Sequence, residues 1–131
     1  MINSSIFNYV DILDKAADAA YIRHDVISNN IANKDTPNYK RQDVQFETIL
    51  QASLAGDGSL SERVEQVNMN LEDLSSYIYT DQTSLSYRLD GNNVDPEQED
   101  AYLAENTIRY QTLIDLMKAE FQQYQTVLST S

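Results

Sequence analysis

The sequence contains no cysteine, and histidine occurs once, as His24. The absence of cysteine excludes disulfide bonds, thiolate zinc sites and cysteine nucleophiles together, and it leaves the redox compartment undetermined. His24 lies on a helical stripe of apolar residues, with no second histidine or cysteine to share a metal. We therefore expect a packed or hydrogen-bonded histidine rather than a metal ligand or a catalytic base.

Basic residues are few. Nine Lys and Arg residues stand against 21 Asp and Glu residues, which gives a formal net charge of -12. Phosphate backbones and anionic lipid surfaces repel such a chain. We therefore expect neither a nucleic acid nor a membrane surface as a partner.

Long hydrophobic runs are also missing. The first twenty residues, MINSSIFNYVDILDKAADAA, carry no basic leader, and Asp11 and Asp14 interrupt the one apolar run. This pattern predicts no secretory signal peptide, and no later stretch is long enough to be inserted in a bilayer. If the protein leaves the cytoplasm, we expect a route that needs no such leader.

Catalytic motifs are absent as well. The sequence has neither a phosphate-binding loop nor a nucleophile elbow. Its N-terminal carboxylates, Asp11, Asp14, Asp18 and Asp25, stand at helical spacing and predict a solvated or intersubunit polar face rather than an acid/base pair. We expect a protein that is not an enzyme, with no cofactor, no metal and no small-molecule substrate.

A heptad pattern is present in the first third of the chain. Apolar or small residues recur there in alternating steps of four and three, which is typical of a coiled coil. They are Ile6, Val10, Leu13, Ala17, Ala20, Ile27 and Ile31, with His24 in the remaining slot. The pattern predicts a long helix over residues 4–34.

The last third repeats this pattern. Its apolar positions are Leu103, Tyr110, Ile114, Met117, Phe121, Tyr124 and Leu128, with Thr107 filling the gap. Asp95 suits the N-cap and Pro96 the first helical position. Glu97, Glu99 and Asp100 complement the positive end of the helix dipole. These signals predict a C-terminal helix over residues 95–131.

The two stripes together predict the fold class. Stripes of nearly equal length at opposite ends of one chain favour a mainly α fold, in which the terminal helices pair as an antiparallel coiled coil. At about 1.5 Å per residue, each helix would be roughly 45–55 Å long. Two helices alone would leave much of each stripe in water. We therefore expect the pairing to form on assembly, with other protein chains as neighbours.

The middle of the chain differs in character. Residues 35–58 predict a turn and then a short helix that carries Val44, Phe46, Ile49, Leu50 and Leu54 and ends at Gly56. Residues 59–94 have weak periodicity and predict a variable, partly extended or disordered segment. Within it, SYIYTDQTSLSYRL predicts a short hairpin or an extended arm, and LDGNNVD predicts a turn before the last helix.

The stretch SNNIANKDTPNYKRQDVQF predicts how the first helix ends. Thr36 precedes a proline and is disfavoured in the helical region, so the helix should stop by about Lys34 or Asp35. In the turn that follows, Pro37 fixes φ and Asn38 tolerates the left-handed conformation that a type II turn needs. We expect the asparagines before the turn to bond free carbonyl groups of the last helical turn, of their own helix or a neighbour's.

Two motifs give the chain a resemblance to a known family. NNIANKDTPNYKRQDVQF resembles the signature of the flagellar axial proteins, the rod and hook family. LDGNNVDPEQEDAYLAENTIRYQTLI resembles the block before the terminal helix in the short, proximal rod members. The match covers residues 6–50 and 88–128, and it departs at Asn38, where the family usually has glycine. The matching positions are Asn29, Asn30, Ile31, Ala32, Asn33, Asp35, Thr36, Pro37 and Tyr39, then Leu89, Asp90, Gly91, Asn92, Val94, Asp95, Tyr110 and Gln111.

The resemblance implies a structural subunit of the proximal rod of the bacterial flagellar basal body, a part of the cell's motility apparatus. It implies export of the unfolded chain through the type III apparatus and helical assembly outside the cytoplasmic membrane through the terminal helices. The implied partners are copies of the same chain, other rod proteins, and export-gate and adaptor proteins at the rod base.

One alternative stays open. A small acidic chaperone or adaptor of a type III secretion system shares this length and charge. Such a chaperone would be a compact and stably folded dimer, whereas we expect the free rod subunit to have mobile termini.

Overall fold

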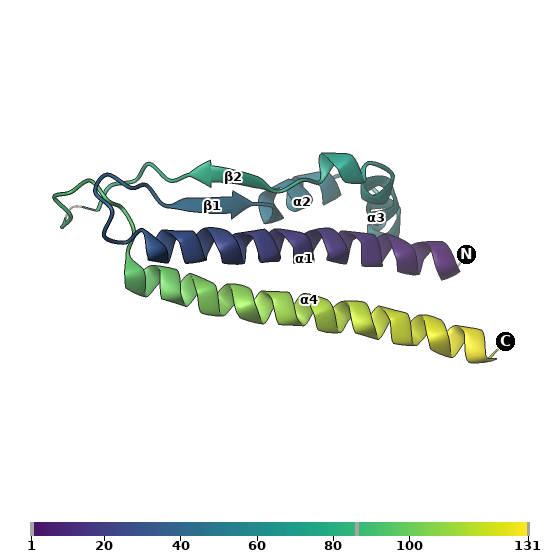
Figure 1. Cartoon of the computed structure of the whole chain (residues 1–131). Helices are drawn as coiled ribbons and strands as arrows, with labels where there is room; N and C mark the ends of the chain where they lie inside the picture. Colours follow the sequence, from purple (N-terminus) through teal and green to yellow (C-terminus); the bar gives the residue numbers. More distant parts are fainter. Residues whose placement is uncertain (1, 86, 131) are drawn as a thin grey trace.

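A computed structural model describes residues 2–85 and 87–130, with side chains from Phe7 onward. Two long helices form the two ends of the fold, and short helices and strands fill its middle. In chain order the elements are α1 (Ile2–Ala32), β1 (Gln42–Gln45), α2 (Glu47–Leu54), α3 (Leu60–Met69), the 3₁₀ turn η1 (Leu71–Asp73), β2 (Tyr77–Thr80) and α4 (Pro96–Thr130). Helix α1 lies in the middle layer, with α4 on one side and the strands, α2 and α3 on the other (Figure 1).

Helices α1 and α4 run antiparallel, so that the two chain ends lie at the same end of the molecule (Figure 1). Near the N-terminus, the ring centroids of Phe7 and Tyr124 are 5.5 Å apart. Nearer the middle of the pair, the Asn106 Nδ2 atom donates to the Ala20 carbonyl oxygen at 2.8 Å. The predicted mainly α fold with paired terminal helices is therefore confirmed.

The predicted stripe on α1 is largely covered within the single chain. Val10, Ala17, Ala20 and Ile27 are buried, and Leu13 and Ile31 are partly buried, while His24 is exposed. The predicted stripe member Ile6 has a side chain outside the described residues. We expected α1 to need other chains to cover this stripe, and α4 of the same chain covers much of it.

Helix α1 also carries a second apolar stripe, which the sequence analysis did not predict. Ile12 and Ala19, with the partly buried Tyr9 and Ala16, follow each other in steps of three and four. They pack in one cluster with the buried residues of the middle segment, which are Phe46, Val64, Val67 and Leu74. Because α1 lies between two layers, it buries two faces where a surface helix buries one.

Helix α4 is covered far less. Of its described residues, Glu99 and Asn106 are buried. Of the predicted stripe, five residues are partly buried, namely Leu103, Tyr110, Ile114, Met117 and Tyr124. Phe121 and Leu128 are 47% and 53% exposed. The reason is that α4 has α1 along one side and open solvent along the other (Figure 1).

The inward positions of α4 differ from the apolar positions counted in the sequence. Buried or partly buried residues follow each other in steps of four and three, namely Glu99, Leu103, Asn106, Tyr110, Leu113, Met117, Glu120 and Tyr124. Three of the predicted positions are exposed, namely Thr107, Phe121 and Leu128. At the first two, the preceding residues Asn106 and Glu120 point inward in their place. Because several inward positions carry polar residues, a count of apolar residues did not reveal which positions of α4 face inward.

The short helix of the middle segment starts later than expected. Residues 47–54 form α2, whereas Val44 lies in β1 and Phe46 precedes the helix. Val44 and Phe46 are both buried, and their spacing of two residues is that of a strand. The placement of these two residues in the helix was therefore wrong.

Strands β1 and β2 form a two-stranded antiparallel sheet, with Gln42 opposite Thr80 and Gln45 opposite Tyr77. The tyrosine-rich stretch is thus extended, but it pairs with a strand far away in the sequence rather than folding into a local hairpin. Helix α3, within the segment expected to be variable, was not predicted. It begins with a capping box between Ser59 and Glu62, which fixes a helix start from local residues.

Candidate functional site

The two motif blocks meet at one end of the molecule, where α1 ends and α4 begins (Figure 1). The Asn38 amide donates to the Asp90 carbonyl oxygen at 2.8 Å, and the Asn93 amide donates to the Tyr39 carbonyl oxygen at 3.2 Å. Segments about fifty residues apart are thus joined through their main chains. We call residues 29–41 and 88–99 the helix-end junction.

The turn after α1 has the predicted conformation. The Tyr39 amide donates to the Thr36 carbonyl oxygen at 3.2 Å, which closes a four-residue turn around Pro37 and Asn38. Asn38 has a φ of 62°, the left-handed value that we expected for it. Helix α1 ends at Ala32, two residues before the expected end.

Asparagine side chains bond main-chain carbonyl groups at the end of α1 and in the turn after it. The Asn33 Nδ2 atom donates to the Asn29 carbonyl oxygen at 2.8 Å. The Asn92 Nδ2 atom donates to the carbonyl oxygens of Asn33 at 2.9 Å and Thr36 at 2.8 Å. Each of these carbonyls also accepts from a main-chain amide, so they are not the free carbonyls that we expected. The second motif supplies one of the two donors, which the sequence did not indicate.

Gly91 lets the two motif blocks come this close. Its φ is +76°, and a Cβ atom there would lie 2.5 Å from the Asn38 Oδ1 atom. No other residue fits without displacing Asn38, because real Cβ contacts are longer and because L residues rarely adopt this φ. The Lys40 ammonium also donates to the Gly91 carbonyl oxygen.

Asn30 joins α1 to β1 and to α4. Its side chain is fully buried, and it pairs with the main chain of Gln42 as a strand residue would. Nδ2 donates to the Gln42 carbonyl oxygen at 2.7 Å, and Oδ1 accepts from the Gln42 amide at 2.9 Å. Nδ2 also donates to the Glu99 carboxylate at 3.1 Å. This asparagine is therefore a buried structural connector.

A buried ion pair lies beside Asn30. The Arg41 guanidinium donates to the Glu99 carboxylate, and the two residues are 8% and 1% exposed. Asp81 and Asp43 lie 3.3 and 3.4 Å from the same guanidinium. Burial alone lowers the pKa of Arg41, but the hydrogen bond and charge of Glu99 outweigh burial and the net pKa is raised. The Arg41 guanidinium therefore stays charged inside the junction.

Sequence reasoning missed the role of this pair. Glu99 lies in the first helical turn, as predicted, but it is buried rather than exposed. Its partner Arg41 lies 58 residues earlier in the chain, and no local pattern links the two. A buried charge is costly unless it is paired, so each of these residues requires the other.

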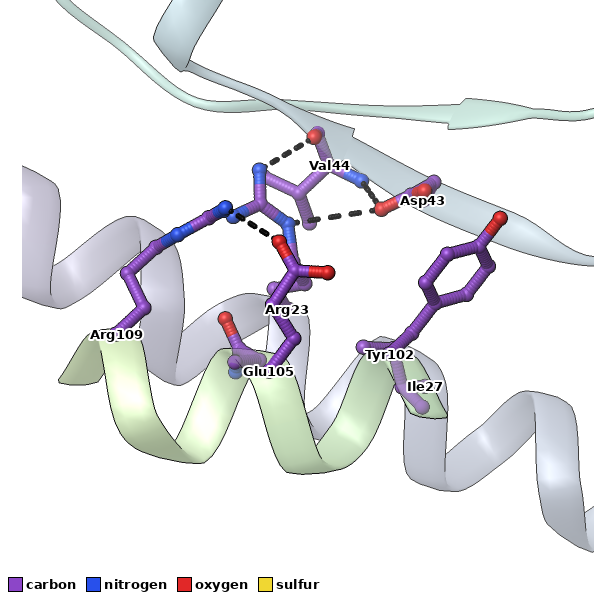
Figure 2. Close-up of a pocket in the computed structure, with 8 residues that line it drawn as sticks. Arg23, Ile27, Asp43, Val44, Tyr102, Glu105 and Arg109 are labelled. Carbon is purple, nitrogen blue, oxygen red and sulfur yellow. Dashed lines mark hydrogen bonds and ion pairs between the residues drawn. The ribbon is translucent and has the colours of Figure 1, made fainter. Parts of the chain in front are cut away.

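A second set of charges lies in a pocket between α1, β1 and α4 (Figure 2). Arg23 donates to the Val44 carbonyl oxygen at 2.8 Å and to Glu47 at 2.6 Å. Arg109 of α4 donates to Glu47 at 2.8 Å and to Glu105 at 2.9 Å. Burial raises the pKa of Glu47, but the hydrogen bond and charge of Arg23 outweigh burial and the net pKa is lowered.

This pocket joins three elements through ion pairs. Each of its two guanidinium groups is already paired with carboxylates, so neither is free for an anionic ligand. Among residues 2–85 and 87–130, no group of three His, Cys, Asp or Glu residues could hold a metal ion. No described helix has the length and apolar character needed to cross a membrane.

The other predicted motif residues divide into those that are at least partly buried and those that are exposed. Val94 is completely buried, and Asp95 caps α4 as predicted, since its carboxylate accepts from the amides of Glu97 and Gln98 at 3.1 and 3.4 Å. Ile31, Tyr39, Asp90 and Tyr110 are partly buried. The exposed group consists of Asn29, Ala32, Asp35, Thr36, Pro37, Leu89 and Gln111.

Comparisons with known proteins agree with this geometry. Residues 12–40 match the family described as flagella basal body rod protein. The chain is 38% identical over 117 residues to the flagellar basal body rod protein FlgB of Bacillus subtilis. The aligned residues make up 89% of this chain and 90% of that protein. FlgB of Borrelia hermsii is 31% identical over 91% of this chain and 94% of its own. FlgB of Escherichia coli is 28% identical, over 82% and 83%.

Proposed function

The chain belongs to the family of flagellar basal body rod proteins, and from this premise we propose how it is built into the rod. It is a structural protein of the flagellar basal body and assembles with other rod components. No relative and no feature of the fold supports the chaperone alternative. Our proposal is that the subunit lies in the proximal rod and contacts its neighbours through its terminal helices.

The observation that carries this proposal is the apolar surface that α4 leaves exposed. Large apolar side chains are exposed along this helix, namely Ile108, Leu116, Phe121 and Val127. Complete burial of such a side chain contributes about 1.5–3 kcal/mol, and exposed apolar patches of this kind mark interaction surfaces. Neighbouring subunits would bury this face in the rod.

The helix-end junction has a different part in the proposal. Its buried residues, Asn30, Asn92, Val94 and Glu99, fix how α4 leaves the end of α1. Other residues of the junction are exposed and are then free to contact neighbouring subunits, namely Asn29, Ala32, Asp35, Thr36, Pro37 and Leu89. The junction thus orients both long helices for assembly, and the helices supply the area that is buried.

The route to the rod follows from the resemblance of both motif blocks to the rod and hook family. We propose that the subunit passes through the type III export apparatus as an unfolded chain and folds outside the cytoplasmic membrane. At the rod base it would contact export-gate and adaptor proteins on one side and further rod proteins on the other.

The test replaces Leu116 or Phe121, both 47% exposed, by aspartate in cells that lack the native subunit. We expect each variant to be secreted at the normal level, because export does not need the folded helix, and we expect basal bodies without a rod. Gln122→Asp is the matched control, because it adds the same charge at an exposed polar position of the same helix. Normal motility of the Leu116→Asp and Phe121→Asp strains would rule out the proposed contact surface.

A further inference from the structure

Aspartate is followed by glycine twice in this chain, at Asp57-Gly58 and at Asp90-Gly91. At such a pair the glycine amide nitrogen can attack the aspartate Cγ atom, because glycine has no Cβ atom to crowd the ring that forms. The attack needs an aspartate side chain that can turn back onto the main chain and an amide that no acceptor holds. The two pairs differ in their ability to meet these conditions.

Asp57 and Gly58 lie in the exposed loop of residues 55–59, between α2 and α3. Among the described residues, neither of them has a hydrogen-bond or ion-pair partner. The capping box begins one residue later, where the Ser59 amide donates to the Glu62 carboxylate at 2.8 Å. The Asp57 carboxyl group is therefore free to change rotamer and approach the Gly58 amide.

The side chain of Asp90 is held by hydrogen bonds within the helix-end junction. The Arg88 guanidinium donates to its two carboxylate oxygens at 3.2 and 3.0 Å, and the Asn92 amide donates to Oδ1 at 3.1 Å. The Asp90 carbonyl oxygen accepts from the Asn38 amide at 2.8 Å. These bonds keep the Cγ atom from turning onto the Gly91 amide.

The charge state of Asp90 acts in the same direction. The hydrogen bond from Arg88 lowers the pKa of the Asp90 carboxyl group. A carboxyl group loses an oxygen atom as water most readily from its protonated form. Asp90 is less often in that form than an aspartate without such a partner, so its pair is protected by both position and charge.

We propose that Asp57 is a site of spontaneous isomerisation in the folded protein, and that the helix-end junction protects Asp90 from the same reaction. The Gly58 nitrogen forms a bond to the Asp57 Cγ atom, the bond from Cγ to one carboxyl oxygen breaks, and that oxygen leaves as water with the amide proton. The product is a cyclic succinimide. Water then adds to either carbonyl group of the ring and the bond from that carbonyl to nitrogen breaks. Opening at Cγ restores aspartate, whereas opening at the main-chain carbonyl gives isoaspartate. The overall change is an isomerisation that needs no reagent but water.

Isomerisation has different consequences at the two positions, because isoaspartate adds one carbon atom to the main chain. In the loop of residues 55–59, the added atom breaks no hydrogen bond of Asp57 or Gly58. At Asp90 it would displace the carbonyl group that accepts from the Asn38 amide, and the two motif blocks would separate. The junction therefore protects the pair whose isomerisation would disrupt it.

The test ages the purified full chain at neutral pH in oxygen-labelled water, once folded and once in concentrated denaturant. Each passage through the succinimide introduces one labelled oxygen atom, and mass spectrometry of the digested chain assigns it to Asp57 or Asp90. In the folded chain we expect labelling at Asp57 to be about tenfold faster or more than at Asp90, because the junction must open locally before Asp90 reacts. In denaturant the two rates should converge, because both pairs then lack their native contacts.

Two variants isolate the causes. Arg88→Ala removes the guanidinium that holds the Asp90 carboxylate, so labelling at Asp90 in the folded chain should rise about fivefold or more while that at Asp57 is unchanged. Asp57→Glu keeps the charge but would require a larger ring, so labelling at this position should be lost.

Equal labelling of Asp57 and Asp90 in the folded chain, or faster labelling of Asp90, would overturn the proposal. A difference that persists unchanged in denaturant would also overturn it, since the cause would then be the neighbouring residues in the sequence and not the fold. An unchanged rate at Asp90 in Arg88→Ala would contradict the protection assigned to Arg88.

Discussion

The two ends of α4 are parts of one helix with opposite characters. At its start, Glu99 and Asn106 are buried, and the helix-end junction around it is held by hydrogen bonds from side chains to main chains. In its second half, Leu116 and Phe121 are both 47% exposed. The contrast shows that one end completes its contacts within the chain and that the other leaves apolar side chains exposed.

Physical chemistry explains why the two ends have different tasks. Buried polar groups lose stability when a partner is missing, so a network such as that of Asn30, Arg41 and Glu99 favours one arrangement. Apolar contacts are non-directional, so an open apolar face can pack against neighbours in more than one geometry. We therefore expect the junction to define the subunit and the exposed apolar residues of α4 to adapt to the assembly.

The largest expected effect concerns the buried ion pair. Glu99→Ala leaves the Arg41 guanidinium buried without its main partner, and we expect a loss of about 3–5 kcal/mol in the free energy of unfolding. Chemical denaturation of the free chain measures it. Glu97→Ala, at an exposed position in the same helical turn, is the matched control and should change stability by about 0.5 kcal/mol or less. Equal losses in the two variants would mean that the junction is not held by this pair.

Gly91→Ala is the next prediction. The added Cβ meets the Asn38 Oδ1 atom and the backbone has a positive φ, so we expect a loss of about 1–3 kcal/mol. In an Asn38→Gly background the clash is removed and only the backbone strain remains. A double-mutant cycle should therefore show a smaller loss for Gly91→Ala in that background. The same loss in both backgrounds would contradict the close approach of the two motifs.

The pocket of Arg23 and Arg109 predicts a pH dependence. The pKa of Glu47 is lowered from its ordinary value of 4.5, so the folded state binds its proton less readily than the unfolded state. The stability from this group is present above the unfolded pKa and is lost as pH falls through the folded pKa. A half-exposed pair contributes about 0.2–1 kcal/mol. Glu47→Gln should therefore be less stable than the wild type at pH 7, and the difference should vanish once pH falls below the folded pKa of Glu47. A difference that is constant with pH would exclude this ion pair.

The smallest expected effect on the free chain belongs to the open end of α4. Phe121 is half exposed, so Phe121→Asp should lower the free energy of unfolding of the monomer by about 0.5 kcal/mol or less, although it stops rod assembly. Thermal or chemical denaturation of the purified monomer checks this. A loss as large as that of Glu99→Ala would mean that Phe121 is part of the core of the single subunit.

Local signals made part of this structure predictable. The two long helices, the N-cap at Asp95 and the left-handed Asn38 all follow from residues within a few positions of one another. The capping box of Ser59 and Glu62 is an equally local signal for the start of α3. The helix was still not predicted, because its apolar stripe is short.

The rest depended on contacts across the chain. The pairing of β1 with β2 joins residues nearly forty positions apart, and that of Arg41 with Glu99 joins residues 58 apart. The inward face of α4 includes Asn106 and Glu120, so a count of apolar residues selected the neighbouring positions Thr107 and Phe121 instead. Polar residues that are buried for structural reasons do not show in an apolar pattern.

Backbone hydrogen exchange of the free subunit and of assembled rods tests the central claim most directly. In the free chain, amides of α4 near Asn106 should exchange slowly, and those beyond about residue 113 should exchange faster by about 100-fold or more, because few contacts hold that half of the helix. In assembled rods both halves should be protected. Slow and uniform exchange along the whole of α4 in the free monomer would contradict the claim that this helix needs neighbours.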